Sequence, residues 1–352
     1  MRLYEESGYL DIPHIDEVAT RNDIAFIVII GKRQVGKTYG VLKYMLDEEK
    51  TFFFLRRVNT ELDMLCHDYN SPFKKIPTAG EIVFKKESKY TAAINRITDL
   101  EGDDINAATQ CVDRIATAST LSGIGNIRGF DGSIYTDMVL DEFIPEEHLY
   151  HVRSEGDAFL NAYTTIAGNR ELEGKPPLKC WLLANSNDLN NAILDALKIT
   201  TTVEHMIMRS EDCRILLDRG IMILLPDSTK ITEKRKQGAL FKAIGADSKF
   251  ARMAYGGEFA YNDFSNVVSR PLKEYNPYIR YGSIVIHIHK SDKHLYITDD
   301  YRCSVKYQMA DNDANQTAFK RRFSDLKVAY LNNRIYFQTM AVKNYFVSIL
   351  DL

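Results

Sequence analysis

Residues 26–42, FIVIIGKRQVGKTYGVL, decide the fold. The run at 24–30 is short, continuous and rich in β-branched residues, which predicts a strand buried on both faces. After Thr38, apolar residues at 41, 42, 45 and 46 recur at the spacing of a helix. Between strand and helix lies Gly31-x-x-x-x-Gly36-Lys37-Thr38, which matches the phosphate-binding loop consensus.

This order of strand, loop and helix is what phosphate binding requires. Glycines let the backbone N–H groups point at phosphate oxygens, and the helix N-terminus adds partial positive charge. Lys37 would reach the β- and γ-phosphates, and the Thr38 hydroxyl would ligate Mg²⁺. The alternative is a glycine turn before an ordinary helix. The residues predicted to bind ATP and Mg²⁺ are Gly31, Lys32, Arg33, Gln34, Val35, Gly36, Lys37 and Thr38.

Composition sets the limits on fold and partners. The chain has 352 residues, 45% of them hydrophobic, which is enough for two domains with their own cores. The net charge of −3 means that any contact with DNA must come from a local basic surface. Five cysteines stand apart without metal spacing, which is typical of reduced thiols. We see no signal peptide pattern and no apolar run that could cross a bilayer.

Further strand patterns alternate with helical ones. They lie at residues 51–57, 81–97, 114–120, 133–143, 178–186 and 220–228. Such alternation predicts an α/β fold with a mostly parallel central sheet covered on both faces, and 81–120 looks like a hairpin insertion or edge strands. After a basic, helical stretch, strand patterns dominate the C-terminal part. We therefore predict an ATPase domain at 1–228, a linker subdomain at 229–265 and a small α+β domain at 266–352.

The sequence MVLDEF places Asp141 and Glu142 at the end of a predicted strand. Ligands of open parallel sheets bind beyond the carboxyl ends of the strands, so Asp141 can lie opposite Lys37 and Thr38. We predict Asp141 as a magnesium ligand and Glu142 as the group that orients the attacking water. The alternative is a surface Asp–Glu pair that follows a buried strand.

Asn185 ends the next strand and is predicted to contact the γ-phosphate or the water; the alternative is a turn, where asparagine is common. Arginines matter because negative charge spreads over the γ-phosphoryl oxygens in the transition state. Arg33 lies inside the loop, and Arg170 could reach the nucleotide of a neighbouring subunit. Most exposed arginines are simply solvated. The other arginine candidates are Arg56, Arg57 and Arg128.

Several motifs resemble those of bacteriophage large terminases. They are GKRQVGKT, FLRRVNTEL, IRGF followed by MVLDEF, and LLANS. Their order and the chain length most resemble the DNA-packaging ATPases of phi29-like phages, over roughly residues 20–230. The resemblance implies that Lys37 and Thr38 bind phosphate and Mg²⁺, Asp141 the metal and Glu142 the water. It places Asn185 at the coupling position, whereas Arg170 does not align securely with the trans-acting arginine.

The same resemblance implies a homo-oligomeric ring that drives double-stranded DNA through a portal into a capsid. A pentamer working in the host cytoplasm, away from membranes, is the implied form. Whether a structural RNA takes part is left open.

Large terminases usually also carry a nuclease domain of RNase H type with a two-metal site. Here the strand YGSIVIHIHK places His287 and His289 where a metal carboxylate is expected. Asp299 and Asp300 follow the next strand, and no third acid falls into place. We therefore expect an RNase H-like domain that has lost its nuclease site.

Two basic clusters are the candidate DNA contacts. They are Lys234, Arg235 and Lys236, beside Lys230, and Lys320, Arg321 and Arg322. Phosphate contacts are independent of sequence, which suits a translocating grip, and the alternative is a solvated helix face. Three other functions stay open: a terminase with an active nuclease, a nucleotide-gated binding switch, and a small-molecule kinase.

Overall fold

In a computed structural model, the chain forms two compact units, Met1–Tyr261 and Asn262–Leu352. The structure describes residues 3–33, 35–67, 71–77, 80–99, 110–127, 132–146, 152, 154–227, 229–245, 262, 264–299 and 303–350. Within these ranges, we find no helix with both the length and the apolar character that a membrane crossing requires.

The first unit is built on a nine-stranded sheet, counted over the described residues, in the order β3-β4-β5-β2-β6-β7-β1-β9-β8. Its strands are β1 (Phe26–Gly31), β2 (Phe52–Arg56), β3 (Glu81–Lys86), β4 (Ala92–Asp99), β5 (Gln110–Thr120), β6 (Asp137–Asp141), β7 (Lys179–Asn185), β8 (Cys213–Leu216) and β9 (Ile221–Leu224). Neighbours from β5 to β9 in this order run parallel, whereas β3, β4 and β8 pair antiparallel. The predicted α/β fold with a mostly parallel sheet is confirmed.

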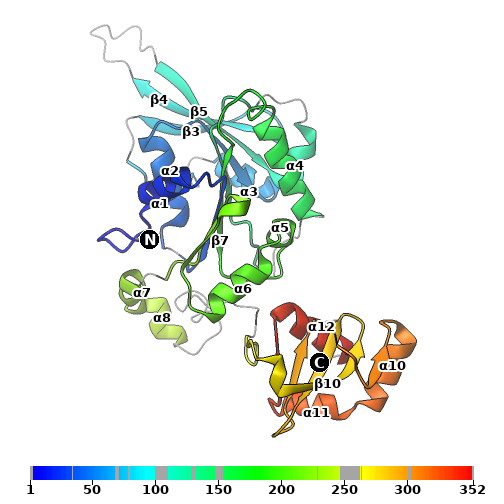
Figure 1. Cartoon of the computed structure of the whole chain (residues 1–352). Coiled ribbons are helices and arrows are strands. Elements are labelled where there is room, and N and C mark those ends of the chain that lie inside the picture. The colour runs from blue at the N-terminus through cyan, green and yellow to red at the C-terminus, as the bar shows by residue number, and fades with distance from the viewer. Residues whose placement is uncertain are drawn as a thin grey trace. The chain divides into compact units, whose positions relative to one another are not determined.

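Helices cover both faces of this sheet. In the described part of the first unit, the α-helices are α1 (Ile12–Arg21), α2 (Lys37–Asp47), α3 (Asn59–Leu65), α4 (Glu155–Ala167), α5 (Ala192–Ala196), α6 (Thr200–Met208), α7 (Thr229–Lys236) and α8 (Ala239–Ile244). Two 3-10 helices, η2 (Leu121–Asn126) and η3 (Leu217–Arg219), join them. Figure 1 shows α1 and α2 on one side of the sheet and α4 and α5 on the other.

The alternation of side chains along each strand explains the two layers. Ile27 and Ile29 of β1 are fully buried in one cluster with apolar residues of α1 and α2. Phe26 points to the other face, where its ring contacts Phe159 of α4 with centroids 6.5 Å apart. Because both faces of the strand are covered, β1 is apolar throughout, as its sequence predicts.

A buried polar cluster fastens α1 to the sheet. Asp16 of α1 accepts hydrogen bonds from Tyr44 at 2.7 Å and from Lys179 at the start of β7 at 2.5 Å. Lys50 lies 3.2 Å away. Burial alone raises the pKa of Asp16, but the hydrogen bonds from Lys179 and Tyr44 and the charge of Lys50 lower it below its usual value.

The second unit holds a five-stranded sheet, again counted over the described residues, in the order β13-β10-β11-β12-β14. Its elements are η5 (Leu272–Glu274), β10 (Tyr275–Tyr281), β11 (Ile284–His289), β12 (Leu295–Thr298), β13 (Tyr307–Met309), α10 (Asp313–Arg322), α11 (Asp325–Leu331), β14 (Ile335–Phe337) and α12 (Met340–Leu350). This is the expected α+β composition, whereas its likeness to RNase H stays a prediction. Helices α7 and α8, which fall in the predicted linker at 229–265, lie within the first unit, and the predicted linker subdomain stays a prediction.

Candidate nucleotide site

The phosphate-binding loop lies between β1 and α2, as predicted. Gly31 ends β1, and α2 begins at Lys37. Gly36 is the N-cap of α2 with φ of 84°, a left-handed conformation that favours glycine because a Cβ would be strained there. That turn starts the helix directly at Lys37, so the N-terminus of α2 faces the loop. Gln34, also predicted here, lies outside the described residues.

Lys37 is buried in the loop that it follows, with 7% of its surface exposed. Its ammonium donates to the backbone oxygens of Gly31 at 3.0 Å and Lys32 at 2.7 Å. It also donates to the side-chain oxygen of Asn185 at 3.1 Å. Asn185 ends β7 directly beside Gly31 in the parallel register of β1 and β7, so the structure brings the predicted loop lysine and the predicted asparagine together.

Thr38 and Asp141 also meet across the sheet edge. The Thr38 hydroxyl donates to Asp141 Oδ1 at 2.7 Å. Asp141 is the last residue of β6, which neighbours β2 and β7. A hydroxyl and a carboxylate oxygen in contact are the donor types that Mg²⁺ takes in proteins, so these two residues fit the predicted magnesium site.

Arg56, at the end of β2, bridges both acidic residues. It donates to Asp141 Oδ2 at 2.7 Å and to Glu142 Oε2 at 3.0 Å, and its Nε lies 3.7 Å from Glu61. Burial opposes the charge on Arg56, but these three carboxylates raise its pKa above the usual value. For Asp141, burial raises the pKa and the charge of Glu142 adds to that effect, while Arg56 opposes it; the net pKa is raised. Arg56 therefore offsets part of the negative charge at this edge.

Glu142 has a backbone conformation that is rare for this residue type. Its φ is 57°, and its side chain is 52% exposed. The backbone on both sides is held, because Asp141 belongs to β6 and the N–H of Phe143 donates to Leu183 of β7 at 3.1 Å. Asn191 then donates to the Phe143 carbonyl at 3.2 Å. Strained residues of this kind cluster at active sites, and here the strain directs the carboxylate into solvent beside the loop.

These residues line one cavity of about 310 Å³ at the carboxyl edge of the sheet. Its lining residues are Arg33, Gly36, Lys37, Thr38, Tyr39, Asp141, Glu142, Ala184 and Asn185. Arg33, predicted near the phosphates, reaches this cavity and forms an ion pair with Glu146. The predicted residues Gly31, Lys32 and Val35 belong to the same loop as Arg33 and Gly36. The Lys32 ammonium forms an ion pair with Asp227.

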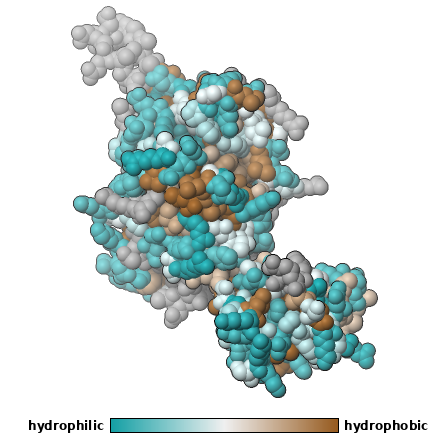
Figure 2. Space-filling view, in the orientation of Figure 1, coloured by the Kyte–Doolittle hydropathy of each residue, from teal (hydrophilic) through white to brown (hydrophobic). Residues whose placement is uncertain are grey.

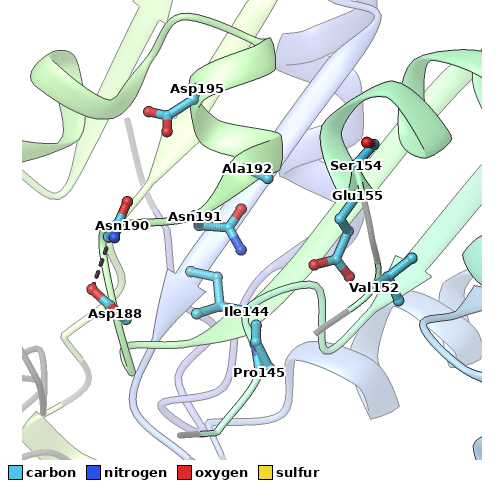
Figure 3. Close-up of a pocket in the computed structure, with 10 residues that line it drawn as sticks. All are labelled: Ile144, Pro145, Val152, Ser154, Glu155, Asp188, Asn190, Asn191, Ala192 and Asp195. Carbon is cyan, nitrogen blue, oxygen red and sulfur yellow. Dashed lines mark hydrogen bonds between the residues drawn. The ribbon is translucent and has the colours of Figure 1, made fainter. Parts of the chain in front are cut away.

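A larger cavity of about 510 Å³ lies beside the segment that follows Glu142 (Figure 3). Ile144 and Pro145 form part of its wall, and Asp188 accepts a hydrogen bond from the Asn190 backbone at 2.9 Å. Among its other polar groups, the Asn191 side chain caps α5. The predicted nucleotide-binding residues line the smaller cavity instead.

Arg170 does not reach this site. It is 5% exposed, and its guanidinium donates to the backbone oxygens of Tyr135 and of Pro176, the latter at 2.6 Å. Both acceptors precede strands β6 and β7, so Arg170 lies at the opposite edge of the sheet from the loop. Within its own chain Arg170 therefore satisfies buried carbonyls, and its action on the nucleotide of a neighbouring subunit stays a prediction. Arg128 lies outside the described residues.

The predicted basic clusters fall in different units. Lys234 and Lys236 are exposed on α7, and Lys236 pairs with Glu233 at 2.8 Å. Arg235 belongs to the same helix, but its side chain lies outside the description. The remaining candidates end α10: Lys320, Arg321 and Arg322.

Sequence patterns missed the aromatic partner of Arg322. Its guanidinium stacks 4.3 Å from the ring centre of Tyr307, and Lys306 lies 5.4 Å from the same ring. A hydrogen bond from Arg322 and the charge of Lys306 lower the pKa of Tyr307. In the sequence, only the neighbouring pair Lys306 and Tyr307 indicated a basic aromatic site. The contact with Arg322 arises because the fold places α10 beside Tyr307.

The expected nuclease residues do not come together in the described part of the second unit. His287 is buried, and its Nε2 lies 3.0 Å from the Thr298 hydroxyl. The Asp299 backbone N–H donates to Gln338 at 3.2 Å, and Asp300 lies outside the described residues. Whether the unit is a former nuclease stays a prediction.

No family model and no curated protein sequence matches the chain. Solved structures do match it. The bacteriophage Phi-29 viral genome packaging motor assembly contains a chain that is 16% identical with a TM-score of 0.58, covering 95% of this chain and 97% of that one. A chain of the Phi-28 gp11 DNA packaging motor is 16% identical with a TM-score of 0.47, and the match covers 96% of this chain and 97% of that one. The large terminase ATPase domain of Thermus phage P74-26 is 13% identical with a TM-score of 0.39, and the match covers 70% of this chain and 93% of that one.

At 16% identity, the likeness to the Phi-29 assembly shows a shared fold over nearly the whole length of both chains. The resemblance of the sequence motifs to phage DNA-packaging ATPases is thereby confirmed at the level of the fold.

Proposed function

We propose that this protein is an ATPase that drives double-stranded DNA through a portal into a viral procapsid. One observation carries the proposal. Lys37, Thr38, Asp141, Glu142 and Asn185 come from three separate segments and meet at one cavity, at the carboxyl edge of a parallel sheet. Their donors and acceptors match the parts that phosphoryl transfer requires, in a fold that a phage packaging motor shares.

The nucleotide phosphates bind in the loop, against its N–H groups and the N-terminus of α2. The Lys37 ammonium then exchanges the loop carbonyls for phosphate oxygens. The Thr38 hydroxyl and the Asp141 carboxylate would hold Mg²⁺, which would supply positive charge to the phosphates. An additional aromatic surface is available for the base, because the half-exposed ring of Tyr9 lies against Gly36.

Glu142 orients the attacking water from its exposed position beside the loop, and Arg56 holds that carboxylate in place. Asn185 accepts a hydrogen bond from Lys37, so loss of the γ-phosphate would alter that hydrogen bond. The change would reach β7, because Asn185 is its last residue. Arg33 supplies positive charge from within the loop. The trans-acting arginine would come from a neighbouring subunit, and within its own chain Arg170 is held by backbone carbonyls.

The proposed motor works as a ring, a pentamer in the expected form, in the cytoplasm of the host cell. Figure 2 shows a continuous apolar area on the visible face of the first unit, bordered by hydrophilic side chains. Exposed apolar areas of this kind mark contacts with other proteins, either another copy of the chain or the portal. A structural RNA would be a further partner.

DNA contact is assigned to Lys234, Arg235 and Lys236 of α7 and to the basic end of α10. Exposed cations without base-reading geometry contact phosphates, which suits a motor that must pass any sequence. The second unit is proposed as a former nuclease that now serves in such contacts.

The test is steady-state ATP hydrolysis by the full chain, with and without long double-stranded DNA. Glu142→Gln removes the carboxylate that orients water but keeps its size, and a drop in kcat of at least about 10²-fold is expected. Glu173→Gln is the matched control, because Glu173 is exposed and pairs only with nearby Lys175. The control should hydrolyse ATP at the original rate.

DNA should stimulate the wild-type rate, and the stimulation should weaken as salt increases. Hydrolysis that ignores DNA at every salt concentration would count against a translocase and favour a nucleotide-gated switch. Equal rates for the Glu142 and Glu173 variants would contradict the assignment of the site itself.

A further inference from the structure

Two histidines face each other across the turn between β11 and β12 in the second unit. The strands pair antiparallel up to Ile288 and Leu295, and the His289 N–H then donates to the His294 carbonyl at 2.9 Å. Their imidazole rings stack with centroids 4.3 Å apart at an angle of 17°. Lys293 has φ of 61°, which closes the turn and returns Asp292 towards both rings.

Asp292 completes a three-residue cluster. Its Oδ1 lies 2.7 Å from His289 Nδ1 and 2.5 Å from His294 Nδ1. One ligand-type atom from each residue lies within 4.8 Å of those of the other two. The histidine side chains are 17% and 13% exposed, whereas Asp292 is 61% exposed, so the cluster is open to solvent on one side only.

The convergence on one oxygen is unusual for a simple hydrogen-bonded turn. Besides the two ring nitrogens, the His294 backbone N–H approaches the same Oδ1 at 3.3 Å. The Ser291 hydroxyl lies 3.1 Å from His289 Nδ1, and the Asp292 N–H lies 3.5 Å from it. A backbone N–H can only donate, so it favours an unprotonated Nδ1. The 2.7 Å contact of His289 Nδ1 with Asp292 Oδ1 needs a positive partner between the two atoms, either a proton on Nδ1 or a bound cation.

The outer nitrogens of both rings have oxygen atoms near them. His294 Nε2 lies 2.5 Å from the Tyr275 hydroxyl, and His289 Nε2 lies 4.0 Å from Glu274 Oε2. Metal-bound histidines usually donate their second N–H to such an oxygen, which leaves the other nitrogen free for the metal. Arg270 donates to the Tyr275 hydroxyl at 3.4 Å, which fixes the position of that oxygen, and the same Arg270 nitrogen lies 3.3 Å from His294 Nε2.

We propose that His289, Asp292 and His294 bind a divalent transition-metal ion, with Zn²⁺ as the ion of choice. Two imidazole nitrogens and one carboxylate oxygen suit Zn²⁺ or Co²⁺, whereas Mg²⁺ takes oxygen ligands. Solvent water supplies the fourth ligand on the exposed side. In a tetrahedral site, ligands at about 2.0–2.2 Å from Zn²⁺ are roughly 3.3 Å apart, so the Asp292 carboxylate moves outward by about 0.6–0.8 Å when the ion enters.

The ion would tie the β11–β12 turn together and fix the second unit at that end of its sheet. The site is separate from the predicted nuclease residues, since neither Asp299 nor Asp300 belongs to it. All three ligands belong to the second unit, whereas the residues proposed for ATP hydrolysis belong to the first.

The experiment uses the full chain, freed of metal with a chelator. Co²⁺ is added as a spectroscopic probe, and Zn²⁺ is then used to displace it. We expect a visible absorption of four-coordinate Co²⁺ that saturates at one ion per chain and is lost on adding one equivalent of Zn²⁺. Asp292→Asn and His294→Gln should each weaken Zn²⁺ affinity at least about tenfold, because each removes a ligand.

His14→Gln is the matched control. His14 Nδ1 also contacts a carboxylate, Glu17 at 3.2 Å, but in the described structure no third ligand joins that pair. Its Zn²⁺ affinity should equal that of the wild type. Tyr275→Phe keeps all three ligands and removes the outer oxygen, so its affinity should fall by about tenfold or less.

The Tyr275 variant also shows whether a weaker affinity comes from the lost outer contact or from misfolding. If the fold is intact, its Co²⁺ spectrum should keep the wild-type shape. Absence of the Co²⁺ absorption in the wild type would overturn the proposal. So would a wild-type affinity in both Asp292→Asn and His294→Gln, because the ion would then be bound elsewhere.

Discussion

Replacing Arg57 by methionine tests how the first unit holds α4 against the sheet. Arg57 follows β2 and is 1% exposed, and its side chain donates to Glu155, in the first turn of α4, at 2.6 Å and 3.3 Å. Glu155 is itself 4% exposed. Removing one partner of a buried ion pair leaves the other charge without compensation, which costs about 3–5 kcal/mol.

For a unit of this size, each kcal/mol lowers Tm by roughly 2–4 °C, so the fall should be about 6–20 °C. The fluorescence of Trp181 is the assay. It is the single tryptophan of the sequence and lies fully buried in β7, so it reports unfolding of the first unit alone. This matters because a chain of two units need not unfold in one step.

Arg21→Met is the matched control, since Arg21 pairs with Glu17 at the surface, where such pairs contribute about 0–1 kcal/mol. Replacing Arg57 and Glu155 together by methionine should recover most of the loss, because no buried charge remains. If Arg57→Met and Arg21→Met lower Tm by the same amount, the reasoning from burial is refuted.

Three further predictions follow from other contacts. Arg56→Gln should lower kcat for ATP by at least about tenfold while leaving the Trp181 transition near its original temperature, because Arg56 orients the two acids at the end of β6; an unchanged kcat would contradict that. The lowered pKa of Asp16 stabilises the fold above the unfolded pKa of about 4, and this contribution is lost as pH falls through the folded pKa, so Asp16→Asn should flatten the decline of Tm in acid. Gly132→Ala should cost at least about 1–3 kcal/mol, since its Cβ would lie 2.2 Å from the Ile166 carbonyl oxygen; a Tm equal to the wild type would show that the backbone yields easily there.

The parallel sheet and the nucleotide loop could be predicted because their signals are local. An apolar strand, a glycine loop and a helix at 26–42 need only neighbouring residues to be recognised. Asp141 and Asn185 followed from one general rule, that the carboxyl ends of parallel strands meet at one edge. The hydrogen bond from Lys37 to Asn185 is the direct outcome of that rule.

The arginines could not be assigned in the same way, because a guanidinium on a long side chain reaches whatever the fold places near it. Arg56 and Arg57 are adjacent in sequence, yet one bridges the acids at the nucleotide site and the other is buried against α4. Arg170 was predicted at a nucleotide and lies at the far edge of the sheet.

The sequence by itself determined the class of fold, the position of the glycine loop between a strand and a helix, and the side chains that we propose for phosphate and magnesium. These depend on periodicity and on residues close together in the chain. Only the tertiary structure decided which arginine meets the two acids, how the backbone at Glu142 is strained, and that His289 and His294 share one carboxylate. Those contacts arise because packing brings distant or oppositely directed segments together, and no local pattern records where a side chain points.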